Sequence, residues 1–214
     1  MQWGSWRRTT ALVLLAALIT ALVGCTAGQA PPPPEPEVVP EPSTLESYDT
    51  TGVNVVRGPF CDRVSPTGIE HALGDVPADS ESWDDGDRER LPDGTRDRVY
   101  EYGCRWTAAD ATQASACAWV TGGAKTQAQA RVLTTDVSRD AYGATCRAAP
   151  NAADFGAPGA TATCTLDTGN TLIERAGLFG DAWLTCSVMA AGDPADLAAR
   201  ASEWCVQVVE ATRS

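Results

Sequence analysis

The acidic composition of this 214-residue chain limits what it can bind. It carries 28 acidic side chains against 16 basic ones, a formal net charge of −12. Such a surface repels nucleic acid and anionic lipid headgroups, which excludes nucleic acid as an expected partner and suits divalent cations or basic partners.

The first 24 residues have the pattern of a lipoprotein signal peptide. Arg7 and Arg8 precede an apolar run, Thr9–Val23, and the segment ends in Leu22-Val23-Gly24-Cys25. The run holds about fifteen residues, whereas a transmembrane helix needs roughly 20. We therefore expect cleavage before Cys25 and attachment of palmitate or a similar acyl chain to that cysteine. The chain would then be anchored in the cell membrane, facing outside the cytoplasm.

A proline- and glutamate-rich segment follows the predicted lipid anchor. Residues 25–51 include Pro31-Pro32-Pro33-Pro34-Glu35-Pro36-Glu37. Proline fixes φ and lacks an amide donor, so this composition favours an extended polyproline II stalk. Residues 52–214 have the usual length of one domain, and we expect them to form a single extracytoplasmic unit.

The first half of this domain predicts one helix and a hairpin. Residues 53–57 are predicted as a short strand, and Ser65-Pro66 begins a two-turn helix that ends at Gly74. Residues 75–98 are predicted as a long acidic loop. A hairpin centred near residues 110–111 follows, with strands at 99–107 and 115–121.

In the second half of the domain we expect a helix, then strands in which apolar and polar residues alternate, and then a last helix. The capping box Thr126–Gln129 predicts a helix running toward Cys146, although 131–137 also fits a strand. Alternation predicts three further strands, at 160–166, 171–178 and 182–189. The last helix begins at Asp193-Pro194 and carries the apolar stripe Leu197, Ala201, Trp204, Cys205 and Val208.

These elements predict an α+β domain. We expect a mostly antiparallel sheet of about five to six strands, with three helices packed on it and disulfides stapling the layers.

Seven of the eight cysteines follow Cys25, and in an oxidising compartment they are expected to form disulfides. The predicted strand 182–189 and the last helix place Cys186 and Cys205 at their shared contact, which predicts that pair. Cys146 and Cys164 form the second predicted pair.

The partner of Cys104 is open between two cysteines. In the predicted hairpin, Cys104 lies opposite Cys117 and Tyr102 lies opposite Trp119. We prefer a Cys61–Cys104 bond, because directly facing cysteines strain a disulfide in a regular ladder. Cys117 is then the free thiol.

A resemblance to known proteins rests on the segment that ends at Cys25 (the lipobox), the proline-rich stalk, Cys61 before a short helix, and three later segments. The three segments are Tyr102-Gly103-Cys104-Arg105-Trp106, the stretch 177–186 and Trp204-Cys205-Val206. With these features the chain resembles a group of uncharacterised actinobacterial cell-envelope lipoproteins. The resemblance implies a disulfide-stapled α+β domain of unknown function in the envelope. It implies no catalytic residue.

Two groups of side chains suggest binding, and each has a simpler interpretation. Oxygen ligands gather in the predicted acidic loop as weak calcium candidates, namely Asp84, Asp85, Asp87 and Glu89. Their spacing is not that of an EF-hand, so we favour a solvated acidic loop. Four aromatic side chains are expected on one hairpin face as part of the core, namely Tyr100, Tyr102, Trp106 and Trp119.

The candidates for catalysis are sparse. His71 is the only histidine and is expected on the solvent side of its helix, so no Ser-His or Cys-His site is predicted. We expect a non-enzymatic binding or interaction module without a cofactor, whose partner is a small ligand, an envelope glycan or another envelope protein. One alternative is a hydrolase using two carboxylates from the set Asp154, Asp167, Glu174 and Asp181. Another is a calcium- or redox-responsive sensor that uses the acidic loop or Cys117.

Overall fold

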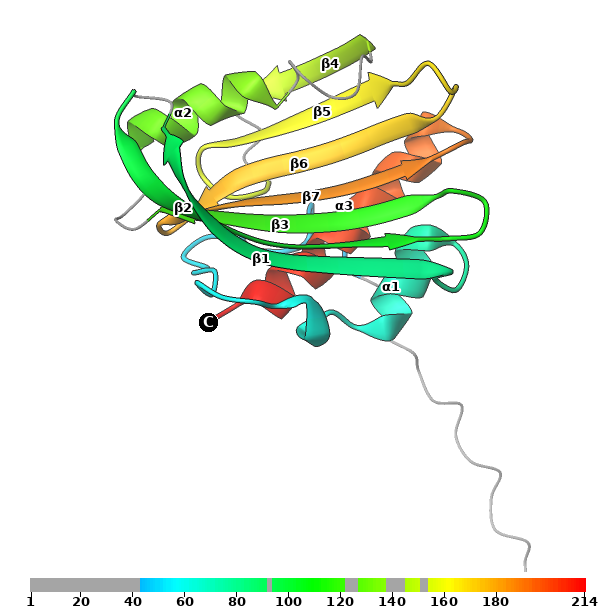
Figure 1. Cartoon of the computed structure of the whole chain (residues 1–214). Coiled ribbons are helices and arrows are strands. Elements are labelled where there is room, and N and C mark those ends of the chain that lie inside the picture. Colours follow the sequence, from blue (N-terminus) through cyan, green and yellow to red (C-terminus); the bar gives the residue numbers. More distant parts are fainter. Residues whose placement is uncertain (1–42, 92–93, 122–126, 138–144, 151–153) are drawn as a thin grey trace, which may run out of the picture. The chain divides into compact units, whose positions relative to one another are not determined.

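A computed structural model describes residues 43–91, 94–121, 127–137, 145–150 and 154–214 (Figure 1). The predicted signal peptide (1–24), Cys25 and most of the predicted stalk lie outside these residues. The described residues form three α-helices, a short 3₁₀ turn at Cys61–Arg63 and one antiparallel sheet of seven strands. The helices are α1 (Pro66–Leu73), α2 (Gln127–Asp136) and α3 (Pro194–Thr212). None of them is both long enough and apolar enough to cross a bilayer.

The strand order in the sheet is β1-β2-β3-β7-β6-β5-β4. All neighbouring strands are antiparallel, which matches the predicted α+β class with a mostly antiparallel sheet. The strands are β1 (Asp79–Arg90), β2 (Arg96–Thr107), β3 (Gln113–Thr121), β4 (Thr145–Pro150), β5 (Gly159–Thr165), β6 (Thr171–Phe179) and β7 (Ala182–Ala190).

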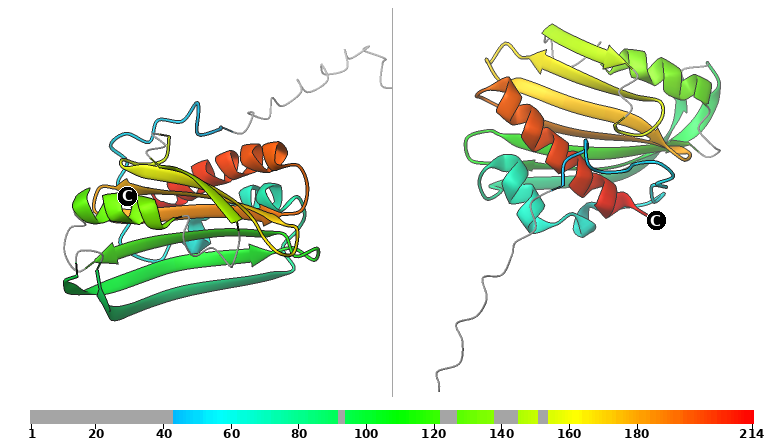
Figure 2. Two further views of the ribbon diagram at one scale, coloured as in Figure 1. Left: turned by 90° about the horizontal axis from the view of Figure 1, so that it is seen from above. Right: turned by 180° about the vertical axis from the view of Figure 1, so that it is seen from behind.

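The two faces of the sheet are covered differently (Figure 2). Helices α1 and α3 pack on one face, which we call the helical face. Helix α2 lies on the opposite face, where it contacts β5 and β6 and covers only one end. We call this second face the groove face.

Helix α3 supplies most of the cover on the helical face. Its N-terminus is capped by Asp193, whose carboxylate accepts a hydrogen bond from the Ala195 amide at 2.7 Å, and Pro194 occupies the first turn. All five residues of the predicted apolar stripe are buried. Trp204 packs edge-to-face on Trp106 with ring centroids 5.5 Å apart.

Helix α1 agrees with its predicted bounds. The Ser65 hydroxyl accepts a hydrogen bond from the Gly68 amide at the N-terminus. At the C-terminus Gly74 adopts φ of 74°, the left-handed conformation that favours glycine. Ile69 and Leu73 are buried against the core, as the sequence pattern indicates.

Three disulfides cross-link the domain. They are Cys61–Cys104, Cys146–Cys164 and Cys186–Cys205, with Cα–Cα distances of 5.8, 4.0 and 5.5 Å. These are the pairs expected from the sequence, and Cys117 is the one free cysteine among the residues that the structure describes. Cys146 and Cys164 face each other directly in the β4–β5 ladder, so direct opposition does not by itself prevent a disulfide.

The sheet has more strands than predicted. Strand β1 lies within the stretch predicted as an acidic loop and pairs with β2 over its whole length. Strand β4 occupies a stretch for which the sequence predicts only the end of a helix. Conversely, residues 53–57 contribute one isolated bridge, Val55 to Arg213, instead of a strand. The helical alternative for 131–137 is correct, since α2 runs to Asp136; its predicted cap, Thr126, lies outside the described residues.

The hairpin of β2 and β3 has a different register from the predicted one. Its turn is closed by the Ala108 amide, which donates to the Thr112 carbonyl at 2.9 Å, and Ala111 has φ of 69°. This loop places Cys104 opposite Ala116 instead of Cys117. Because a one-residue slip moves side chains to the other face, Cys117 and Trp119 lie on the groove face. Tyr100, Tyr102 and Trp106 pack with the helical-face core, and the predicted four-residue aromatic row is therefore wrong.

Candidate functional site

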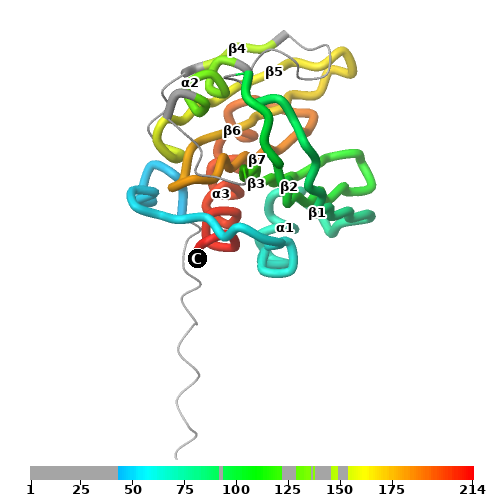
Figure 3. Tube along the Cα trace, turned by 60° about the vertical axis from the view of Figure 1, so that its left-hand side comes forward, coloured from blue at the N-terminus to red at the C-terminus, as the bar shows by residue number. Residues whose placement is uncertain are grey.

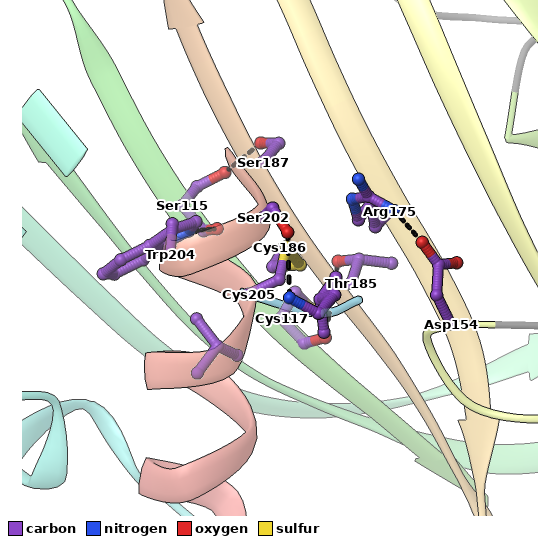
Figure 4. The surroundings of a disulfide bond; sticks show 12 residues. Ser115, Cys117, Asp154, Arg175, Thr185, Cys186, Ser187, Ser202, Trp204 and Cys205 are labelled. Atoms are coloured by element: carbon purple, nitrogen blue, oxygen red, sulfur yellow. Dashed lines mark hydrogen bonds and ion pairs between the residues drawn. A yellow bond between two sulfur atoms is a disulfide. The ribbon is translucent and has the colours of Figure 1, made fainter. Parts of the chain in front are cut away.

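A line of polar side chains crosses the groove face. Arg105 on β2 lies opposite Ser115 on β3, Ser115 lies opposite Ser187 on β7, and Ser187 lies opposite Glu174 on β6. Directly opposed residues in an antiparallel sheet point to the same side. The Ser115 and Ser187 hydroxyls are 2.8 Å apart and share a hydrogen bond (Figure 4). Four strands therefore present one continuous polar row.

The next row along the sheet consists of small residues, namely Gly103, Cys117, Thr185 and Ala176. Trp83 on the edge strand β1 lies opposite Gly103 and packs over it. A Cβ atom at position 103 would lie only 2.2 Å from the Trp83 ring, so this close approach requires glycine. The Trp83 ring therefore projects above this row of small side chains and bounds it at the β1 edge of the sheet.

Six residues of these two rows form the floor of a groove of about 480 Å³, namely Arg105, Ser115, Ser187, Glu174, Cys117 and Thr185. Its other end has an apolar wall of Leu166, Leu172 and Met189. Helix α2 covers a separate part of this face, where its Ala130 packs with Trp183 and Leu178. Figures 1 and 3 show the far ends of β1 and β2 bending toward α2 on this side of the sheet. The volume of this groove falls in the range of sites that bind small molecules.

Glu174 is the only carboxylate in the groove lining, as the described residues define it. Burial raises its pKa to about 7, because the groove removes water from the charged form. Within the described part of the chain, no donor forms a hydrogen bond with this carboxylate. The only basic residue in the lining, Arg105, is held by Glu81 at 2.9 Å. Glu174 is thus a carboxylate that lacks a counter-charge.

Acidic side chains on β1 and β2 add negative charge beside the groove. Glu101 lies opposite Asp85 in the ladder, and burial together with Asp85 and Glu89 raises the pKa of Glu101. The field of Glu101 and Asp85 also reaches the free thiol on the floor. There, desolvation first, and then Glu101, Asp85 and Glu174, raise the pKa of Cys117 to about 12. Cys117 is therefore a neutral thiol near neutral pH and a poor nucleophile.

The structure separates the four calcium candidates. They lie on β1, where side chains alternate, so Asp84 points to one side of the sheet and Asp85, Asp87 and Glu89 point to the other. Among the residues that the structure describes, no group of three or more His, Cys, Asp or Glu side chains is placed to hold a metal ion. The prediction of a loop here is wrong, because these residues form strand β1. The four acids are nevertheless exposed to solvent, as predicted.

The four acids of the hydrolase alternative do not come together. Asp154 pairs with Arg175, whose neighbours on β6 place it on the helical face, and Asp181 pairs with Arg57. Asp167 is exposed in the turn between β5 and β6, and Glu174 lies in the groove. His71 is exposed as expected, with Nδ1 3.1 Å from the Glu203 carboxylate on α3.

Sequence reasoning identified Glu174 as an acid of interest but missed its neighbours. Ser115, Thr185 and Ser187 interrupt otherwise apolar strands at every second position, which is the available signal of a polar face. Their convergence depends on the strand order and on the hairpin register, and neither can be read from alternation.

Comparison of the chain with protein-family models and with curated proteins gives no match.

Proposed function

We propose that this protein is a non-enzymatic binding module of the cell envelope that takes a small ligand in the groove described above. In this proposal the signal peptide is removed, Cys25 is acylated, and the domain is displayed outside the cytoplasm on a proline-rich stalk. The single observation that carries the binding function is the groove itself, with hydrogen-bonding groups on its floor and apolar side chains at both ends.

The chemistry of the lining supports binding over catalysis. The floor offers two serine hydroxyls, a threonine and one carboxyl group, which can orient a ligand by hydrogen bonds. General acid–base cleavage with two carboxylates would need a second acid across the groove from Glu174. The acids of the candidate set instead lie in ion pairs or in a turn.

Met189 provides a direct reporter of groove occupancy. The chain has two methionines, Met1 and Met189, and Met189 lies in the apolar wall of the groove. We suggest labelling the methionine methyl groups of the full chain with carbon-13 and assigning the signal with Met189→Leu. Three probes share a phenethyl or benzyl body: phenethylamine, phenethyl alcohol and phenylacetate. Ligands of this size are expected to bind with a dissociation constant of about 1–10 mM.

We expect at least one probe to shift the Met189 methyl signal in a saturable manner. Ser187→Trp, which fills the centre of the floor, should abolish the shift, whereas Thr51→Trp, at an exposed turn position, should retain it. Thermal unfolding and an intact mass with three disulfides check that both variants fold. Absence of a Met189 shift with all three probes at about 10 mM contradicts the binding function.

A further inference from the structure

We propose that the ligand of this groove is a small organic cation, whose ammonium or guanidinium group pairs with Glu174 while its apolar body lies between Trp83 and the wall of Leu172 and Met189. The inference rests on the proposed function and names the chemical class of the ligand.

The first argument is the missing counter-charge. A carboxylate removed from water is costly unless a donor or a cation compensates it. Glu174 receives no hydrogen bond from the described residues, and the guanidinium of Arg105 is already paired with Glu81. A cationic group of the ligand would supply what the groove lacks and would favour the charged form of Glu174.

The second argument is the field around the groove. Among the described residues, the titratable and charged groups beside the groove floor come from three strands: Glu81, Asp85 and Glu89 on β1, Glu101 and Arg105 on β2, and Cys117 on β3. Glu81 and Arg105 offset each other, and the Cys117 thiol is neutral. Asp85, Glu89 and Glu101 remain, so the field of the described side chains beside the floor is negative and attracts a cation while repelling an anion.

The third argument is the shape of the lining. Trp83 stands at one end of a floor built from small residues, and the aliphatic side chains of Leu166 and Leu172 stand at the other. An aromatic side chain close to a bound cation adds attraction through its ring. Hydrocarbon groups of the ligand bury apolar surface at the opposite end. The groove is therefore suited to a cation that also has an apolar part.

The three probes of the Met189 experiment separate this inference from the proposed function. At about pH 8, phenethylamine should bind at least about tenfold more tightly than phenethyl alcohol, the scale of one charge-assisted contact. Phenylacetate should bind most weakly. Glu174→Gln should bring the amine and the alcohol to nearly equal affinity, whereas Glu70→Gln, the same change at an exposed site on α1, should keep the preference.

Measuring the affinities of the same probes at lower pH gives a second test, which uses the wild-type protein. At about pH 5.5 the Glu174 carboxyl carries its proton, so the preference for the amine should shrink by about tenfold. Equal affinities for the amine and the alcohol at about pH 8, or tighter binding of phenylacetate, overturn the cation inference and leave groove binding intact. If none of the three probes shifts Met189, both proposals fail.

Discussion

Glu174 couples the folding of this protein to pH. Its pKa rises from the ordinary value of 4.5 to about 7, because burial in the groove removes water from the carboxylate. A higher pKa in the folded state means that folding tightens the binding of this proton. The resulting stabilisation is fully present below about pH 4.5 and is lost as pH rises through about 7.

Replacing this carboxylate by its neutral isostere should therefore stabilise the protein only in alkaline solution. At about pH 8 we expect Glu174→Gln to raise the free energy of unfolding by about 1–3 kcal/mol. At about pH 4 the effect should nearly vanish, because the wild-type side chain is then protonated. Thermal or urea unfolding at both pH values measures the difference, with Glu70→Gln as a control at an exposed site. The same stabilisation at both pH values would show that Glu174 is not the titrating group.

The β2–β3 hairpin shows how a single turn decides which side chains reach the groove. Ala111 holds φ of 69°, a conformation that costs an L-residue about 1–2 kcal/mol. The turn persists because it sets a register that buries Ala114, Ala116 and Ala118 under the helices. With the register predicted from sequence, Cys117 would face the helices instead of the groove.

Glycine at this turn should relieve the strain without changing the register. We expect Ala111→Gly to raise the free energy of unfolding by about 0.5–1 kcal/mol, after the extra entropy of glycine in the unfolded chain is subtracted. Ala109→Gly, in the same turn but without a positive φ, should be neutral or destabilising. Urea unfolding of both variants tests this, and a stabilisation by Ala109→Gly equal to that by Ala111→Gly would contradict the explanation.

The elements that were predictable from sequence carry a strong local signal. Helices α1 and α3 have a capping side chain followed by proline, and β5 and β7 alternate over most of their length. Strand β1 has no such signal: the sequence Asp79–Arg90 is almost wholly polar, because it is an edge strand with exposed side chains. Its pairing partner, and not its own sequence, makes it a strand.

The same distinction explains the candidate site. The partner of Cys104 stayed open, because the choice between Cys61 and Cys117 depends on the hairpin register. The Cys186–Cys205 pair was predictable, because a strand and a helix with clear local signals place both cysteines at their contact. The groove was not, because it combines residues from β1, β2, β3, β6 and β7, and their alignment depends on the order of strands and on one positive φ. Local periodicity fixes which residues share a strand face, and only the assembled sheet fixes which strands meet.

At the scale of the whole molecule, the proposed location at the cell membrane depends on acylation of Cys25. If Cys25 receives an acyl chain, growth with radioactive palmitate should label the protein in the membrane fraction, and Cys25→Ser should abolish the label. Cys117→Ser is the matched control, because it removes the free thiol of the domain instead. Equal labelling of Cys25→Ser and the wild type would contradict the proposed anchor.

The first described residues join the domain on the helical face. The Leu45 amide donates to the Ser202 hydroxyl of α3 at 2.9 Å, and the Tyr48 hydroxyl donates to Glu210 further along the same helix. The first described residues thus lie on the side of the sheet that faces away from Ser115 and Glu174. A fluorescent protein fused directly to residue 43 would therefore be attached behind the sheet, and solutes would still reach the cavity.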